Sequence, residues 1–138
     1  MSPSEEEKSR KTLWVFWGAF TYASFFYGVI GYWVRCSARI SVSGELSSML
    51  IPVFIGLALM ETIVLFLLMP RFAQKTSYSS YCILRWALAG SIGVYGFVLF
   101  VLGASWVILA IFLGWALLLN LILMPTQNDR DKFEQLSK

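Results

Sequence analysis

Residues 49–69 of the chain read MLIPVFIGLALMETIVLFLLM. The segment contains a single ionisable side chain, Glu61, and is otherwise almost entirely apolar. A helix needs about 20 consecutive apolar residues to cross the hydrocarbon layer of a bilayer. The segment is therefore predicted to be a membrane-spanning helix with one acidic group near its middle.

Three more apolar segments of similar length predict a protein with four spans, at residues 12–34, 49–69, 83–102 and 106–124. Only 14% of the 138 residues are charged, against roughly 25% in an ordinary soluble domain. Lipid cannot hydrogen-bond an exposed backbone, which favours helices. We expect an all-α integral membrane protein, with residues 1–138 forming one four-helix domain and two short cytoplasmic tails.

The first span is too long for a signal-peptide core and no small-residue cleavage site follows it, so we expect it to remain as an anchor. The sequence Ser4-Glu5-Glu6-Glu7 has the spacing of a helix N-terminus. Two alternatives follow from this: the first helix begins in water before Thr12, or the tail is frayed and solvated.

The basic residues predict the orientation. Four spans place both termini and the middle loop on one side, together with nine of the eleven Lys and Arg residues: Lys8, Arg10, Lys11, Arg71, Lys75, Arg85, Arg130, Lys132 and Lys138. The other side has Arg35 and Arg39. Cytoplasmic loops carry the excess of positive charge, so both termini are expected in the cytoplasm, with the protein in the bacterial inner (plasma) membrane.

Residues near the span ends carry further expectations. Trp14, Trp17, Trp33, Trp86 and Trp106 are expected to be interfacial anchors. Arg71 and Arg85 are expected to extend toward lipid headgroups. Pro70 and Pro125 are expected to end their helices, which leaves a polar loop at residues 35–48, a basic loop at residues 70–82 and a bare turn at residues 103–105.

Short matches between the two halves suggest a duplication. Tyr27-Gly28 recurs as Tyr95-Gly96, and Met69-Pro70 recurs as Met124-Pro125. The four helices would then be two tandem related hairpins, parallel to one another about an axis along the membrane normal. Chance similarity between apolar segments is the alternative.

Several functional classes lack the residues they need. The chain has no histidine, which excludes His-ligated haem and histidine general bases. No phosphate-binding loop, dinucleotide fingerprint, metal-binding cluster or nucleophile elbow is present. The two cysteines, Cys36 and Cys82, are predicted at opposite faces and too far apart to pair. We expect no enzymatic activity, no cofactor, no metal and no nucleic-acid partner.

Glu61 is the candidate ion-binding residue, because a charged carboxylate deep in a span is penalised by about 3 kcal/mol. It should be protonated, or paired and hydrogen-bonded. Thr21, Tyr22 and Ser91 lie at similar depth and are possible partners. Asn120, a few ångström nearer the cytoplasm, is a further one. Glu61 is then either a proton- or cation-binding carboxylate, or a neutral acid that hydrogen-bonds neighbouring helices or a partner subunit.

Small residues recur in the first and third spans, where they allow helix backbones to approach closely. The glycines in question are Gly18, Gly28, Gly31, Gly90, Gly93 and Gly96. They predict helix packing, either inside this bundle or at a dimerisation face.

Residues 54–61 (FIGLALME) and 87–96 (ALAGSIGVYG) resemble the carboxylate helix of the c-type proteolipid subunits of rotary ATPases. Members of that family are helical hairpins, some duplicated to four helices, whose carboxylate carries an ion. The resemblance implies the same role for Glu61. The sequence departs from the family pattern at Gly90, where the family acid would stand, and in the predicted orientation.

These observations give two functional expectations. The first is a non-catalytic structural or assembly subunit of a larger membrane complex, whose partners are the lipid bilayer and either other membrane subunits or further copies of itself. The second is a proteolipid-like subunit in which Glu61 carries H⁺ or Na⁺.

Overall fold

A computed structural model describes residues 3–38 and 44–136, and all regular structure in that part of the chain is helical. The elements in order are α1 (Pro3–Ala38), α2 (Gly44–Ile63), the π-helical turn η1 (Val64–Leu68), α3 (Met69–Phe72), the short 3₁₀ turn η2 (Ala73–Lys75), α4 (Tyr78–Val101), α5 (Trp106–Ile122) and α6 (Gln127–Leu136).

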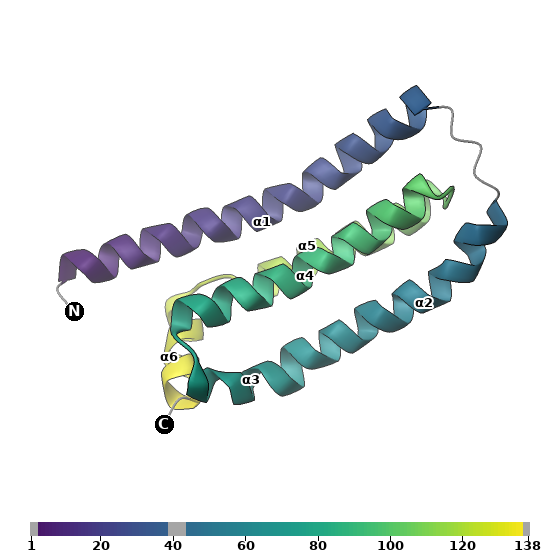
Figure 1. Cartoon of the computed structure of the whole chain (residues 1–138). Helices are drawn as coiled ribbons and strands as arrows, with labels where there is room; N and C mark the ends of the chain where they lie inside the picture. Colours follow the sequence, from purple (N-terminus) through teal and green to yellow (C-terminus); the bar gives the residue numbers. More distant parts are fainter. Residues whose placement is uncertain (1–2, 39–43, 137–138) are drawn as a thin grey trace.

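Helix α4 is the centre of the molecule. It packs against α5, α1 and α2, and α1 also contacts α5. Figure 1 shows α1 and α4 running in one direction and α2 and α5 in the other, with both termini at the same end. The largest fully buried side chains include Trp86 and Phe100 of α4 and Phe112 of α5. The core therefore lies between α4, α5 and α1.

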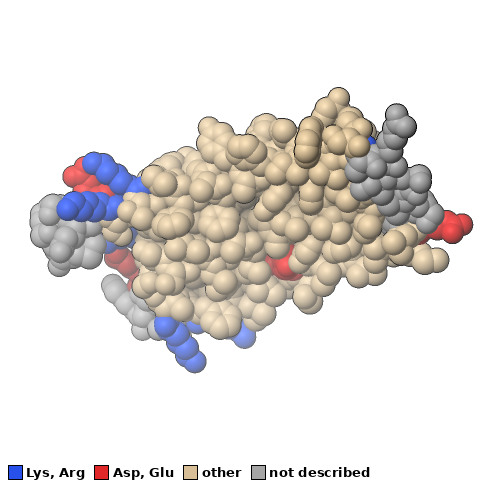
Figure 2. Space-filling model, turned by 45° about the horizontal axis from the view of Figure 1, so that its top comes forward, with Lys and Arg blue, Asp and Glu red and all other residues tan. Residues whose placement is uncertain are grey.

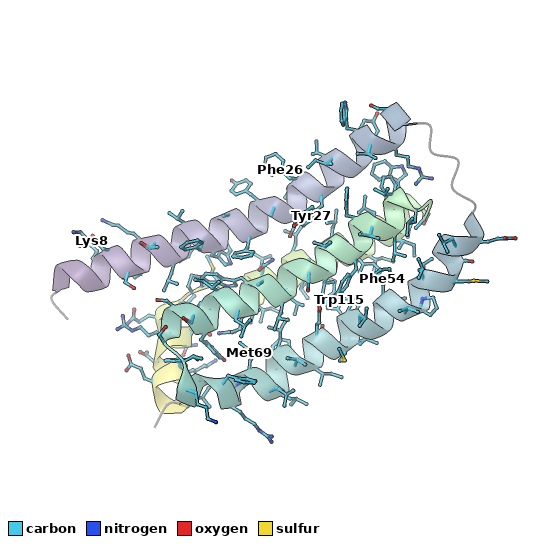
Figure 3. All side chains as sticks on the ribbon, in the orientation of Figure 1. Lys8, Phe26, Tyr27, Phe54, Met69 and Trp115 are labelled. Atoms are coloured by element: carbon cyan, nitrogen blue, oxygen red, sulfur yellow. The ribbon has the colours of Figure 1, made fainter. Side chains whose placement is uncertain are left out.

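Helix α2 joins the bundle through one face. Phe54, Ala58, Glu61 and Leu65 follow one another at helical spacing toward α4, and Ala58 and Leu65 are buried. Figure 3 shows Phe54 and Met69 pointing from this limb toward α4, whereas Phe26 points away from the bundle. Apolar residues on the opposite face of α2 are exposed. The packing of α2 within the bundle therefore comes mainly from its contact with α4.

Three helical stretches are long and apolar enough to cross a membrane: Glu7–Ser37, Ser48–Phe72 and Tyr78–Val101. Helices α5 and α6 together form a fourth candidate span, with an angle of 77° between the two helices. Figure 2 shows the charged side chains gathered toward the ends of the molecule, separated by a broad uncharged band. One acidic spot interrupts this band. Within the apolar stretch Ser48–Phe72, Glu61 is the single acidic residue.

The helix boundaries correct several predictions. Helix α1 begins at Pro3, in agreement with the alternative in which the helix starts before Thr12. The chain does not leave the helix at Pro70 as expected, because α3 and η2 continue to Lys75. The π turn precedes this proline, and the Met69 N–H bonds to the Val64 carbonyl five residues back. The predicted basic loop thus shrinks to Thr76 and Ser77, where the Ser77 side chain accepts from the Ser80 N–H at the start of α4.

The two halves do not form equivalent hairpins. Helices α4 and α5 pack closely and are joined by a tight turn in which Gly103 has φ 100°. By contrast, α1 and α2 lie apart with α4 between them (Figure 1). Part of the expected polar loop, including Arg39, lies outside the described residues.

Most of the singled-out glycines face another helix inside the bundle. A Cβ added at Gly96 would overlap the Cβ of Phe112, so α4 and α5 are in close contact at this position. Similar neighbours surround Gly28, Gly31, Gly90 and Gly93, with the nearest atoms at 3.1–3.8 Å from an added Cβ. Gly18 is different: an added Cβ would have nothing within 4 Å, so among the described residues it does not face another helix.

Polar side chains complete the backbone hydrogen bonding at the helix ends. The last carbonyls of a helix lack intrahelical partners. At the end of α5, Trp17 Nε1 donates to the Asn120 carbonyl at 2.8 Å and Trp86 Nε1 donates to the Leu123 carbonyl at 2.9 Å. At the other end, Arg35 donates to the Ala104 carbonyl at 2.7 Å. Trp86 is 0% exposed, so its expected role as an interfacial anchor is wrong.

Candidate functional site

The candidate site lies where α2 meets α4. Glu61 stands thirteen residues after Ser48 and eleven before Phe72, the limits of the apolar stretch. At a rise of about 1.5 Å per residue, the carboxyl is roughly 17–20 Å from either end. The Glu61 residue is half-buried, and its carboxyl points into the α2–α4 seam.

Two hydroxyl groups on α4 bind the Glu61 carboxyl. Ser91 Oγ is 2.6 Å from Oε2, and the Tyr95 hydroxyl donates to Oε1 at 2.5 Å. Ser91 and Tyr95 are four residues apart, so one face of α4 presents both groups. The Tyr95 ring also packs on Phe54 of α2, with ring centroids 5.2 Å apart. The acid is thus held by two hydrogen bonds and flanked by an aromatic pair.

One arrangement of the hydroxyl hydrogens at this site fits a neutral carboxylic acid. Ser91 Oγ is also 2.6 Å from the carbonyl oxygen of Leu88, and a carbonyl oxygen can accept a hydrogen bond but cannot donate one. A serine hydroxyl has one hydrogen to donate. If Ser91 donates to Leu88, then Glu61 donates to Ser91 Oγ while its other oxygen accepts from Tyr95. The Glu61 carboxyl and the Ser91 and Tyr95 hydroxyls then all have hydrogen-bond partners.

The same site accommodates the carboxylate by rotation of one hydroxyl group. Ser91 would then donate to Glu61, both carboxylate oxygens would accept, and the Leu88 carbonyl would lose this partner. The hydrogen bonds at this site therefore fit both the neutral acid and the carboxylate with the helices in the same positions.

The predicted partners of Glu61 differ in their placement. Ser91 contacts it, whereas Thr21, Tyr22 and Asn120 have other surroundings. The Thr21 hydroxyl donates to the Trp17 carbonyl at 2.9 Å within its own helix, and Tyr22 is 69% exposed. Tyr95 was missed as a partner, although its spacing from Ser91 on a helix places both on one face.

Asn120 is buried inside the bundle on α5. The residue is 0% exposed, and neither its side-chain nitrogen nor its side-chain oxygen has a hydrogen-bond partner. A buried polar group without a partner lowers stability.

We expect the substitution Asn120→Leu to raise the free energy of unfolding by about 1 kcal/mol, because it removes an unpaired amide at similar volume. Thermal unfolding in detergent micelles measures this, with Asn128→Leu on the exposed surface of α6 as the control. A fall in stability would contradict the expectation and would indicate that the amide has a partner, such as a bound water.

A second polar cluster joins α6 to the start of α4. Arg85 Nη1 lies 3.0 Å from both carboxylate oxygens of Asp129, and the Tyr78 hydroxyl donates to the same carboxylate at 3.3 Å. The Arg85 guanidinium also stacks over the Tyr81 ring, 4.9 Å from its centroid. Arg85 is buried in this cluster, so the prediction that it extends to lipid headgroups is wrong.

The comparisons with known proteins give no relative: no family model, no curated protein and no solved structure matches this chain. Within the described residues, no group of three or more His, Cys, Asp or Glu side chains lies together as a metal site would require.

Proposed function

We propose that the chain is an integral membrane protein in which α1, the α2–α3 limb, α4 and α5 each cross the bilayer. The supporting observations are the length and apolar composition of the first three, the apolar sequence of α5, and the uncharged band on the face shown in Figure 2. Both termini lie at the end with most of the basic residues, which favours their placement in the cytoplasm. The bacterial inner membrane is the proposed location.

We further propose that the protein is a non-catalytic structural or assembly subunit of a larger membrane complex. The observation that carries this proposal is the pair of hydrogen bonds that joins the Glu61 carboxyl to α4. Ser91 and Tyr95 use both carboxyl oxygens to fasten α2 to α4. In a membrane, such interhelical hydrogen bonds help to replace the missing hydrophobic drive for helix association.

The outer face of α2 is the proposed contact with another subunit or a second copy. It carries large apolar side chains next to Glu61, among them Leu59, Met60 and Ile63, which are 49%, 55% and 54% exposed. A partner helix on this face would cover the part of Glu61 that α4 leaves open and would remove a polar group from lipid contact.

Site-specific photo-crosslinking in native membranes tests this contact. A crosslinker at Met60 should yield a defined protein adduct, whereas one at Phe26, which is 60% exposed on the outer face of α1, should react with lipid. Lipid adducts alone at both positions, together with a stable monomer after mild solubilisation, would contradict the assembly proposal.

Glu61 substitutions test the proposed fastening of α2. Gln keeps one donor and one acceptor, as the neutral acid does, so Glu61→Gln should leave the free energy of unfolding within about 1 kcal/mol of wild type. Glu61→Ala removes both bonds to α4 and should lower it by about 1–3 kcal/mol. Thermal unfolding of the two purified variants gives the comparison, and equal stability would speak against the fastening role.

Proton transfer by Glu61 is the second candidate function. It is favoured by the Ser91 hydroxyl, whose rotation fits both protonation states of the acid. The Tyr95 hydroxyl oxygen is 2.5 Å from Glu61 Oε1, and the Ser91 hydroxyl oxygen is 2.6 Å from Glu61 Oε2. Both are hydrogen-bond distances. A metal cation bound between the Glu61 carboxyl and these hydroxyl oxygens would require longer oxygen–oxygen distances. The geometry therefore favours H⁺ over Na⁺.

Carbodiimide labelling distinguishes the two functions. Under proton transfer, the reagent should modify Glu61 and block proton uptake by vesicles containing the complex, and Glu61→Gln should assemble normally but abolish this uptake. Glu45, an exposed acid at the start of α2, provides the control site. Normal proton movement with Glu61→Gln would eliminate this second function.

A further inference from the structure

A cavity of about 990 Å³ lies at the end of the bundle that holds both termini. Its walls come from the first part of α1, the start of α4 and the connection from α5 into α6. It opens at the surface, because its lining includes exposed side chains such as Lys11 and Val15. None of the functions proposed above uses this cavity.

The charged part of the lining is basic. Arg10, Lys11 and Arg130 contribute to it, and no Asp or Glu is among the described residues that line it. Lys11 pairs with Glu7 at 2.8 Å and Arg130 with Glu134 at 3.4 Å. Both carboxylates are more than half exposed, and exposed pairs of this kind contribute little. An anion in the cavity can therefore compete for the same cations.

The lining changes from charged to apolar within about one helical turn of α1. Leu13, Trp14 and Val15 follow the basic pair Arg10 and Lys11 after one intervening residue, Thr12, and the two basic and three apolar residues line the cavity. Leu13 is buried, whereas Val15 is 72% exposed on the outside of the bundle. A ligand that fits this wall has an anionic group joined to an apolar chain.

We propose that this cavity binds an anionic phospholipid, with its phosphate between Arg10 and Lys11 of α1 and Arg130 of α6 and an acyl chain along Leu13, Trp14 and Val15. A free phosphate would use only the basic part of the wall. The proposal rests on the membrane placement given above, since only there do headgroups meet this end of the bundle. The bound lipid links α1 to α6 across the cavity.

Native mass spectrometry of the full chain in detergent tests the proposal. The probes are palmitoyl-oleoyl phosphatidylglycerol, phosphatidylcholine with the same chains, and inorganic phosphate. Phosphatidylglycerol should bind at least about tenfold more tightly than phosphatidylcholine, because each basic residue near a headgroup favours the anionic lipid. A large excess of inorganic phosphate should not displace it.

Charge-matched variants provide the control. The variant R10Q/K11Q/R130Q should lower the affinity for phosphatidylglycerol at least about tenfold. The variant K8Q/K75Q/K132Q removes the same charge from exposed positions outside the lining and should lower it less than about twofold. Melting curves without added lipid verify that both variants fold.

Three results would overturn the proposal: equal losses in the two variants, equal binding of the two lipids, or displacement by inorganic phosphate, which would indicate a site for free anions. These measurements need no partner subunit. Their failure is therefore distinct from failure of the assembly function, which the Met60 crosslink tests.

Discussion

Replacing Asp129 with Ala is expected to release α6 from α4 and to lower the free energy of unfolding by about 3–5 kcal/mol. The side chains of Arg85 and Asp129 are only 11% and 17% exposed, and removing one partner of a buried pair leaves the other charge without compensation. The Tyr78 hydroxyl would lose its acceptor as well. The packing of Phe133 on Tyr78 and Tyr81 and the contacts of α6 with α3 and η2 would remain.

Hydrogen exchange of the α6 amides and thermal unfolding in micelles measure this effect. Asp131→Ala is the matched control, because Asp131 is an exposed acid on the same helix. Changing both partners to Leu should restore much of the stability, since no uncompensated charge remains. Unchanged α6 exchange in the Asp129→Ala variant would contradict this account of the docking.

The second large effect is expected at Gly96. Substitution by Ala places a Cβ on the Cβ of Phe112, and neither atom can move without its backbone. Helices α4 and α5 must therefore separate, which should cost about 1–3 kcal/mol of unfolding free energy. Leu at the same position should cost more, because its additional atoms have no space at the helix contact.

Gly56→Ala is the control for this substitution. An added Cβ at Gly56 has nothing within 4 Å, and Ala favours a helix over Gly by up to about 1 kcal/mol. Thermal unfolding should show a lower midpoint for Gly96→Ala and an equal or higher one for Gly56→Ala. Equal midpoints for the two variants would mean that α4 and α5 are not in close contact at Gly96.

Hydropathy and length predicted the apolar helical segments well, because few arrangements satisfy a chain with so little charge. Helix ends were less predictable. The rule that proline ends a helix failed at Pro70, where a π turn allows the helix to continue. The two hairpins are not packed equivalently, because among the described residues α2 packs mainly on α4, whereas α4 and α5 pack directly on each other.

The site was predictable in part. Depth in the predicted spans singled out Glu61 and Ser91, whereas the role of Tyr95 depends on the rotation of α4 about its axis, which hydropathy does not define. The burial of Arg85 depends on α6, which was expected to be a simple tail. A signal was available in Asp129 and Phe133, four residues apart in an otherwise polar segment, a spacing that places both on one helical face.

Thiol labelling in intact cells tests the four-span orientation most directly. Cys36 is exposed near the end of α1, and Cys82 is 1% exposed. A membrane-impermeant maleimide should therefore label the wild-type chain at Cys36 from outside. In a Cys36→Ser background, Lys132→Cys on α6 should react only after the membrane is permeabilised. The reverse pattern would be labelling of position 132 in intact cells and of Cys36 only after permeabilisation. This result would contradict the proposed topology and the placement of Glu61 near the middle of a membrane span.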